Sequence, residues 1–592
     1  MSPPAAVPLW FGPPERPLLG FYHAGAARSL RSRAVVLCYP FGHEYTAAYQ
    51  AYRRLAEKLA EAGFPVFRFD YDGTGDSAGD DSDPARLAAW LSSIGLAIEQ
   101  VQAHSGARDI CLFGLRLGAM LAYLAAAEHA DVRELVLWAP SMTGKVYLRE
   151  WRALRMLKDG PGAPTLPGGD EEAGGFLMTR QTIAELLGVE LLARPVPPVA
   201  KVLLLARDVS LGEQRLADHL RAHGVAVDYR FLPGYDGLIV EPYNVVIPEA
   251  AFAEIVSRLA DSIAAADGPA PARLAAPSAA TMTSTSSIRE SALRFGPDGA
   301  LFGVLSEPLQ AATSRARPAL LLLNTSVIHR VGPNRMYVPM ARRWAAAGYT
   351  VLRFDVAGLG DSPLAGWQAR QRMYQKDSVR DVRAAMDWLA AHRGIERFVL
   401  IGLCSGAYLA FHTGLADPRV AGQVMLNPQT FAWKEGDSLD VGRKLEYKSS
   451  RYYLRALLKR QTWSRLLQGQ IHWQGIAGAL GERALKTART LLTERLSAIL
   501  RPEDAPTEPS VLTNFRRLLE GGVAIFLVYS QEDPGLDELA AHLGQDARLL
   551  RSHRRFRLEL IDGPDHTFTP VGSQRRLEET LRGYLDSFAR QR

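Results

Sequence analysis

Cysteine is scarce in this chain, whose 592 residues include only Cys38, Cys111 and Cys404. Cysteines that are few, widely spaced and odd in number argue against a disulfide framework and favour a reducing compartment, so we expect a cytoplasmic protein. The chain also lacks an apolar run long enough for a membrane-spanning helix. Its first residues lack the basic start and apolar stretch of a secretory signal.

A strong charge of one sign is also absent, because the net charge of +6 is small for this length. No recognised nucleic-acid-binding motif is present, so we expect no nucleic-acid partner. Apolar residues make up 47% and charged residues 22%, which is ordinary for a globular protein. We expect neither a cofactor nor a metal, since the chemistry indicated below requires neither.

An internal repeat is the most informative feature of the chain. Residues 62–77 read AGFPVFRFDYDGTGDS and residues 347–362 read AGYTVLRFDVAGLGDS, which match at ten of sixteen positions. Farther on, residues 114–119 read GLRLGA and residues 402–407 read GLCSGA. In both pairs, the second segment follows the first at nearly the same distance along the chain. This regular spacing indicates a duplicated domain.

Residues 264–287, rich in Ala, Pro, Ser and Thr, have the composition of a flexible linker between the two copies. We therefore expect one domain over 1–263 and another over 288–592. In the second, apolar runs such as PALLLLN (318–324) alternate with amphipathic segments such as VRDVRAAMDWLAAH (379–392). This alternation predicts an α/β fold with a mostly parallel sheet flanked by helices in each domain. Further strands are expected at 349–355, 397–402, 524–530 and 556–561, and further helices at 336–348 and 581–588.

The segment Gly402-Leu403-Cys404-Ser405-Gly406 follows a predicted buried strand and begins a predicted helix, which is the setting of a nucleophile elbow. Small residues two positions before and after the nucleophile let this tight turn pass close to neighbouring strands. The pattern is centred on Cys404, since centring it on Ser405 would put the large Leu403 where a small residue is needed. A lone cysteine is usually a core residue, but this setting predicts that Cys404 is a nucleophile.

A cysteine nucleophile needs a base, and the base needs an orienting carboxylate. Asp533 lies just past one late predicted strand and His566 just past the next, in the order nucleophile, acid, histidine. Glu532 and Asp537 lie close to Asp533 and remain alternative acids. We therefore expect a catalytic triad of Cys404, His566 and Asp533.

These motifs resemble the α/β-hydrolase superfamily and, within it, the hydrolases associated with the exosortase A system. The resemblance rests on NTSVIHRVGPNR (324–335), RFDVAGLGDS (353–362) and GLCSGA (402–407), and it covers nearly all of both halves. It implies two tandem α/β-hydrolase domains with helical lid insertions. It indicates the fold and the catalytic apparatus strongly and the substrate only weakly.

An oxyanion hole is expected beside the nucleophile. The backbone N–H of Ser405 would supply one donor. The loop after PALLLLN would supply the second, near Thr325 or Ser326, with His329 as an optional extra donor.

The first domain retains the fold pattern without the chemistry. Alignment of the repeats puts Arg116 at the nucleophile position and Gly237 at the histidine position, whereas Asp208 occupies the position of the acid. An arginine stays protonated and cannot be the nucleophile, and neither Ser141 nor His43 lies at an elbow. We expect a degenerate domain that packs against its partner domain or docks substrate. Arg116 would either pair with Asp208 or bind an anion at a helix N-terminus.

A helical lid is expected over about 430–515. Within it, residues 443–501 contain thirteen Lys or Arg and three Asp or Glu, interleaved with apolar and aromatic residues at amphipathic-helix spacing. This basic stretch is either a solvated helix surface or a docking surface for an anion. The candidate anions are an acidic acyl carrier protein, the phosphates of coenzyme A and an acidic lipid face.

These residues predict an ester or thioester hydrolase, or an acyltransferase, that forms an acyl-cysteine intermediate on a small-molecule or carrier-bound acyl substrate. Hydrolysis and acyl transfer use the same residues and differ in whether the closed site excludes water. The alternative function, from a non-enzymatic class, is a binding scaffold without catalysis, which is what we already expect of the first domain. The intact Cys, His and Asp set favours the enzyme.

Overall fold

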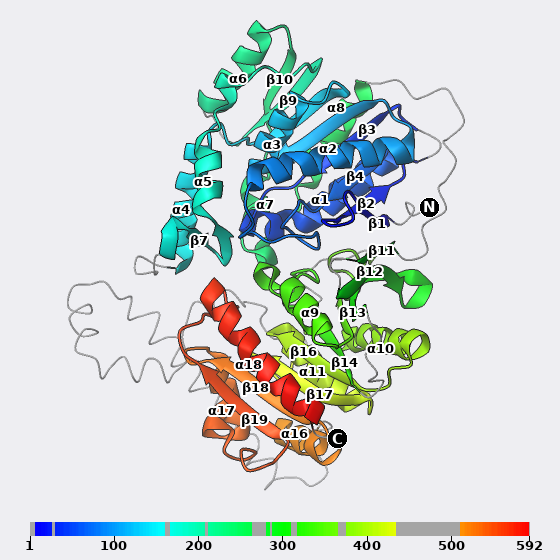
Figure 1. The fold of residues 1–592 in the computed structure, drawn as a ribbon, viewed down its shortest axis with the longest axis vertical. Helices are drawn as coiled ribbons and strands as arrows, with labels where there is room; N and C mark the ends of the chain where they lie inside the picture. Colours follow the sequence, from blue (N-terminus) through cyan, green and yellow to red (C-terminus); the bar gives the residue numbers. More distant parts are fainter. Residues whose placement is uncertain are drawn as a thin grey trace, which may run out of the picture. The chain divides into compact units, whose positions relative to one another are not determined.

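The computed structural model describes residues 6–26, 30–159, 166–207, 211–262, 280–283, 287–309, 317–364, 374–433 and 509–590. The contacts within the chain define two compact units (Figure 1). Unit 1 comprises Met1–Thr313 and Val327–Ala365, and unit 2 comprises Ser314–Ser326 and Gly366–Arg592. The domain boundaries expected from the repeat differ from this division and stay a prediction.

Unit 1 contains an eight-stranded sheet of order β1-β2-β4-β3-β5-β6-β9-β10. The strands are β1 (Val7–Phe11), β2 (Leu18–His23), β3 (Arg33–Cys38), β4 (Val66–Phe69), β5 (Asp109–Leu115), β6 (Val132–Trp138), β9 (Lys201–Ala206) and β10 (Ala226–Phe231). Strands β4 to β10 are parallel, and β2 and β1 extend the sheet antiparallel. Strands β3 and β5 are almost wholly buried, as continuous apolar runs predict.

Helices connect the strands of this sheet and pack on it. The elements are α1 (His43–Glu61), α2 (Arg86–Ser105), α3 (Leu117–Ala126), α4 (Gly144–Asp159), α5 (Arg180–Leu187), α6 (Leu211–Ala222), α7 (Tyr235–Leu238) and α8 (Glu249–Asp261), with a small hairpin of β7 (Glu171–Ala173) and β8 (Phe176–Met178). Helix α1 lies against α8, and α2 lies against α3.

The second sheet has nine strands in the order β11-β12-β13-β15-β14-β16-β17-β18-β19. They are β11 (Ala280–Thr283), β12 (Ile288–Phe295), β13 (Leu301–Pro308), β14 (Ala319–Leu323), β15 (Val351–Asp355), β16 (Phe398–Leu403), β17 (Val420–Leu426), β18 (Ala524–Ser530) and β19 (Phe556–Ile561). Strands β14, β16, β17, β18 and β19 pair in parallel, whereas β11, β12 and β13 pair antiparallel. The predicted α/β class with two mostly parallel sheets is thereby confirmed.

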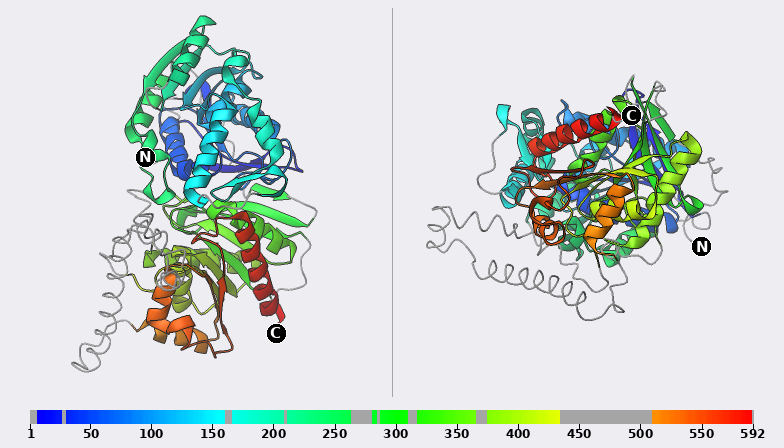
Figure 2. Two further views of the ribbon diagram at one scale, coloured as in Figure 1. Left: turned by 90° about the vertical axis from the view of Figure 1, so that its left-hand side faces the viewer. Right: turned by 90° about the horizontal axis from the view of Figure 1, so that it is seen from below.

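The helices of this half are α9 (Tyr337–Ala346), α10 (Val379–Arg393), α11 (Ser405–Ala416), α16 (Val511–Glu520), α17 (Gly535–Leu543) and α18 (Val571–Arg590). Helix α11 packs on β16 and β17. Helix α18 lies along the sheet (Figure 2). Its Tyr584 ring stacks on Phe526 of β18. No helix in the described parts of the chain is long and apolar enough to cross a membrane.

Most of the elements expected after residue 318 are present. The final helix, expected over 581–588, is α18 and begins ten residues earlier, at Val571. Strands β12 and β13 were not predicted, because IRESALRF and LFGVLSEP mix polar and apolar residues without a regular alternation. The expected lid falls mostly outside the described residues.

The repeated segment forms the same turn in both copies. The Asp76 N–H donates to Asp70 at 2.9 Å, and the Asp361 N–H donates to Asp355 at 3.0 Å. A Cβ on Gly360 would lie within van der Waals distance of the Asp355 carboxylate, so the turn needs glycine there. The aspartate and the glycine therefore shape this turn, as the sequence analysis expects.

Buried ion pairs join the two copies of the segment within unit 1. Arg68 pairs with Asp361, and its counterpart in the repeat, Arg353, pairs with Asp76. Arg330 bridges the set, since its guanidinium lies 2.6 Å from Asp76 and 2.8 Å from Asp361. The reciprocal pairing reflects the duplication at the level of single side chains.

Candidate active site

Cys404 lies between β16 and α11 with a φ of 57° and a ψ of −112°. A non-glycine residue with this backbone conformation costs on the order of 1–3 kcal/mol and persists only where the surroundings enforce it. Gly402 and Gly406 make the turn possible, because a Cβ on Gly402 would overlap the Gly406 backbone. A Cβ on Gly406 would lie 2.7 Å from the carbonyl oxygen of Asn324. The strained turn is that of a nucleophile elbow.

His566 and Asp533 lie together in unit 2, the unit that also contains Cys404. The Nδ1 atom of His566 lies 2.6 Å from Oδ2 of Asp533. The other Asp533 oxygen accepts a hydrogen bond from the Gly535 N–H at 2.8 Å. Asp533 is 2% exposed, and its contacts with the His566 ring and the Gly535 N–H hold its carboxylate in place.

The charge state of His566 depends on its two neighbours. Burial lowers the pKa of His566, but the Asp533 carboxylate and the Cys404 sulfur outweigh it and hold this pKa well above its ordinary value. The second ring nitrogen, Nε2, makes no hydrogen bond of ordinary geometry within the described residues. Nδ1 is thus fixed by Asp533, and Nε2 remains available to the sulfur or to a substrate.

Cys404 is 4% exposed and has a tyrosine beside its sulfur. The Tyr374 hydroxyl lies 3.4 Å from Sγ, and the Tyr374 ring stacks on Trp433. Burial and then Cys404 raise the pKa of Tyr374 well above its ordinary value. The phenol therefore stays protonated and can donate a hydrogen bond to a thiolate.

Two further side chains of the site were missed from the sequence. Gln429 donates through Nε2 to Asp533 at 2.7 Å. Asn427 donates through Nδ2 to the carbonyl oxygen of His566 at 2.7 Å and to Ser530 at 2.9 Å. Asn427 directly follows β17 with a φ of 42°, a conformation that Asn tolerates. An asparagine at the end of a strand was the only feature of the sequence that could have pointed to these side chains.

The expected oxyanion donors lie at the loop after β14 and at the start of α11. The Ser326 N–H donates to the Ser405 side-chain oxygen at 2.8 Å, which ties the two segments together. Thr325 is buried beside them, with 2% exposure. His329 belongs to unit 1, where its ring stacks on Tyr49 at 3.7 Å. Ser405 and Thr325 thus stay the predicted donor positions.

Arg116 keeps the elbow conformation in unit 1, with a φ of 57° and a ψ of −119°. Its Nε donates to Glu44 at 3.0 Å, and its terminal nitrogen pairs with Glu150. The expected partner Asp208 lies outside the described residues. Gly237, which replaces the histidine, lies in the short helix α7. The arginine is therefore neutralised by carboxylates from α1 and α4, which the alignment did not indicate.

The described residues contain no group of three or more His, Cys, Asp or Glu side chains that could hold a metal ion.

We expect His566 to stay protonated to a higher pH in the native protein than in an Asp533→Asn variant, which loses the carboxylate that raises its pKa. The gain in stability from a raised pKa is complete below the ordinary His value of about 6.5 and is lost as the pH rises through the folded-state pKa. The native protein should therefore lose its stability advantage over the variant at alkaline pH. NMR titration with ¹³C-labelled histidine and urea unfolding across pH measure both effects. An unchanged His566 pKa in the variant would contradict this expectation.

Comparison with known proteins places these features in a family. The model of the family described as serine aminopeptidase, S33 (Hydrolase_4), matches residues 31–186 and 327–471, just over half of the chain. No curated protein matches the chain.

Solved structures that resemble the chain do so at low identity. Est1E from Butyrivibrio proteoclasticus, solved with ferulic acid bound, is 15% identical over 43% of this chain and 99% of its own, with a TM-score of 0.31. XC6422 from Xanthomonas campestris, described as an α/β serine hydrolase without a lid, is 16% identical over 43% of this chain and 96% of its own, with a TM-score of 0.28. On the family match, the chain belongs to the serine aminopeptidase S33 (Hydrolase_4) family of α/β-hydrolases.

Proposed function

We propose that this hydrolase cleaves or transfers acyl groups from esters or thioesters through an acyl-cysteine intermediate on Cys404. The observation that carries the proposal is the 2.6 Å contact between His566 and Asp533, combined with the elbow conformation of Cys404. The family description refers to serine, whereas this chain has cysteine at the centre of its elbow. A cysteine beside a histidine base suits thioester as well as ester substrates, because its thiolate is a strong nucleophile.

The first half-reaction forms the acyl-cysteine. The Cys404 thiolate attacks the acyl carbonyl carbon, and the carbonyl oxygen becomes an oxyanion that the Ser405 N–H and a backbone N–H near Thr325 stabilise. When the tetrahedral intermediate collapses, the bond to the alcohol or thiol breaks. His566 gives its proton to that leaving group and becomes neutral.

The second half-reaction releases the acyl group. Neutral His566 takes a proton from water, or from an acceptor alcohol or amine, as that molecule attacks the acyl-cysteine carbonyl. The C–S bond then breaks, and the Cys404 thiolate and the His566 imidazolium are restored. The Asp533 carboxylate keeps Nδ1 protonated and the ring oriented throughout, and Tyr374 donates to the thiolate between turnovers.

The domain that carries Arg116 is proposed to be a pseudo-hydrolase that packs with its partner domain or docks substrate. Arg116 occupies the nucleophile position and is held by Glu44 and Glu150. Gly237 supplies no base, so an Arg116→Cys change is not expected to create a second active site.

Intact-protein mass spectrometry after rapid mixing with a panel of acyl thioesters and esters tests the proposal. A mass increase equal to the acyl group should locate to the peptide that contains Cys404 and decay when water or an acceptor is supplied. Turnover of several substrates without any adduct on Cys404 in the pre-steady state would count against the acyl-cysteine route. Product analysis in the same reactions separates hydrolysis from acyl transfer.

The partner of the site is proposed to be an acyl substrate with an anionic handle, such as an acidic carrier protein or coenzyme A. This rests on the charge of residues 443–501, which lie outside the described residues. Salt screens such attraction over about 10 Å at 0.1 M. Rising salt should therefore lower kcat/KM for a coenzyme A thioester and leave a small uncharged ester unaffected.

A variant with Arg451, Arg455, Lys459 and Arg460 changed to glutamine should lose most of this salt dependence. A variant with Arg575, Arg576 and Arg582 on α18 changed to glutamine is the matched control. Equal salt responses of both substrates would show that the basic stretch is only a solvated helix surface.

A further inference from the structure

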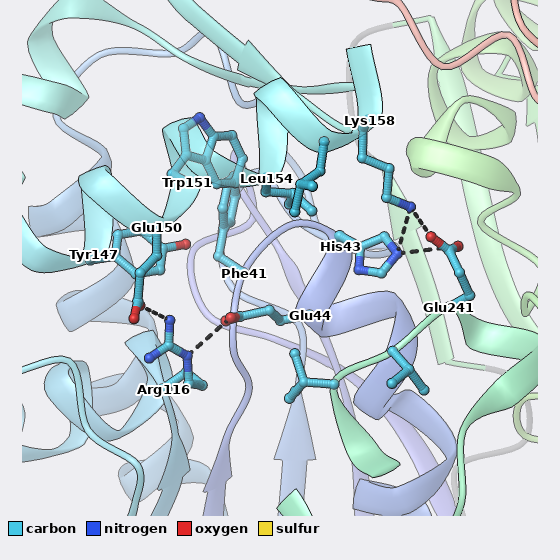
Figure 3. A pocket seen from close by; sticks show the side chains of 13 residues that line it. Phe41, His43, Glu44, Arg116, Tyr147, Glu150, Trp151, Leu154, Lys158 and Glu241 are labelled. Atoms are coloured by element: carbon cyan, nitrogen blue, oxygen red, sulfur yellow. Dashed lines mark hydrogen bonds and ion pairs between the residues drawn. The ribbon is translucent and has the colours of Figure 1, made fainter. Parts of the chain in front are cut away.

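A pocket of about 390 Å³ lies beside the Arg116 elbow, entirely within unit 1 (Figure 3). Phe41, Tyr147 and Trp151 supply aromatic side chains to its wall. It therefore lies at the position that corresponds to an active-site cavity, in the copy of the fold that has lost the nucleophile. Neither the family match nor the chemistry proposed for Cys404 assigns it a ligand.

Two of the three carboxylates that line the pocket are fully engaged. Glu150 is shared between Arg116 and Arg207, the latter at 3.1 Å. Glu241 pairs with Lys158 and lies 3.5 Å from His43 (Figure 3). These groups neutralise one another, and they leave little attraction for an additional charge.

Glu44 is only half engaged. Its Oε1 accepts a hydrogen bond from Arg116 at 3.0 Å, whereas Oε2 is buried and has no hydrogen-bond partner within the described part of the chain. Figure 3 shows the Glu44 carboxylate next to Arg116, below Phe41 in this view. A buried charged acceptor without a donor is unfavourable. A rotation of the Glu44 side chain that turns this atom into the pocket, where a ligand supplies a donor, therefore gains a strong, charge-assisted hydrogen bond.

The remainder of the wall is apolar and opens to solvent. Leu154 and Ile239 line the pocket together with the aromatic rings. Leu157, also part of the lining, is 84% exposed and gives the rim an apolar face. A ligand with a polar head and an apolar body is the kind that such a cavity takes.

We propose that this pocket binds a small primary amine, as its ammonium ion, with an aromatic or aliphatic body. The ammonium head donates to Glu44 Oε2 and lies against aromatic rings that attract cations. An anion is disfavoured, because Arg116 already serves Glu44 and Glu150, and Lys158 is already paired with Glu241. The inference concerns a separate site and does not depend on the reaction at Cys404.

Isothermal titration calorimetry of the full chain with three probes of one shape tests the proposal. The probes are phenethylamine, the neutral 2-phenylethanol and the anionic 3-phenylpropionate. Phenethylamine should bind at least about tenfold more tightly than either of the others. Equal affinities, preference for the anion, or no binding of phenethylamine up to about 10 mM would overturn the proposal.

Variants locate the binding. Glu44→Gln should weaken phenethylamine binding at least about tenfold, and Leu154→Trp, which fills the cavity without changing its charge, should do the same. Glu61→Gln, an exposed position on the same helix, is the matched control and should leave binding unchanged. If Glu44→Gln disturbs folding, Leu154→Trp and the probe series still decide the matter. Unchanged binding in Leu154→Trp would place the amine elsewhere and refute the assignment.

Discussion

Replacing Cys404 with alanine is expected to lower kcat/KM for ester and thioester substrates by at least about 10⁴-fold, because the acyl group then has no covalent acceptor. His566→Ala should come close to this loss, and Asp533→Asn should be milder, since the orienting acid usually contributes least and losses within a triad are not additive. Steady-state kinetics with one thioester and one ester measure the three variants. Undiminished turnover by the alanine variant would remove Cys404 from the mechanism.

The control for this experiment is another buried cysteine. Cys111 lies in β5 of unit 1 and is as fully enclosed as Cys404, but it lies within a strand and not at an elbow. Burial and then Glu134 raise the pKa of Cys111 well above its ordinary value, so its thiol stays neutral. Cys111→Ala should therefore retain activity, and a comparable loss there would point to a stability effect instead of lost chemistry.

The fold and the pairing of Asp533 with His566 could be read from the sequence, because both depend on local patterns. Cys404 lies in a short motif, and Asp533 and His566 each follow a recognisable apolar strand. Parallel strands bring their carboxyl ends to one edge of a sheet, so chain order alone predicted that Asp533 would meet His566. The structure places these two side chains in contact.

The supporting side chains could not be read in the same way. Gln429 and Tyr374 lie in loops without a motif, and their partners are 104 and 30 residues away along the chain. The same holds for Arg116. The alignment of the repeats suggested Asp208 as its partner, whereas the partners in the structure, Glu44 and Glu150, come from helices α1 and α4. Long-range contacts between polar side chains leave no periodic signal in a single sequence, and these are the contacts that shape both elbows.

Arg330→Met is expected to destabilise the protein by about 3–5 kcal/mol, because it removes one partner of a buried ionic set. The guanidinium lies within 2.8 Å of Asp355 and Asp361 and 2.6 Å of Asp76, and all four side chains are essentially inaccessible. Methionine replaces the volume but not the charge. Asp76 and Asp361 would keep Arg353 and Arg68, and Asp355 would lose its ion pair with Arg330.

The control is Arg343→Met on the surface of α9, which should change stability by no more than about 0.5 kcal/mol. Thermal and urea unfolding measure both variants, and the melting temperature serves where unfolding is not two-state. Adding Asp355→Asn to Arg330→Met should restore part of the loss, since it removes the buried negative charge that Arg330 paired with. A loss in the double variant equal to the sum of the two single losses would show that Arg330 and Asp355 do not act as a pair. The ionic set would then be a packing feature, and the reciprocal pairs of Arg68 with Asp361 and Arg353 with Asp76 would suffice to hold the two repeated turns together.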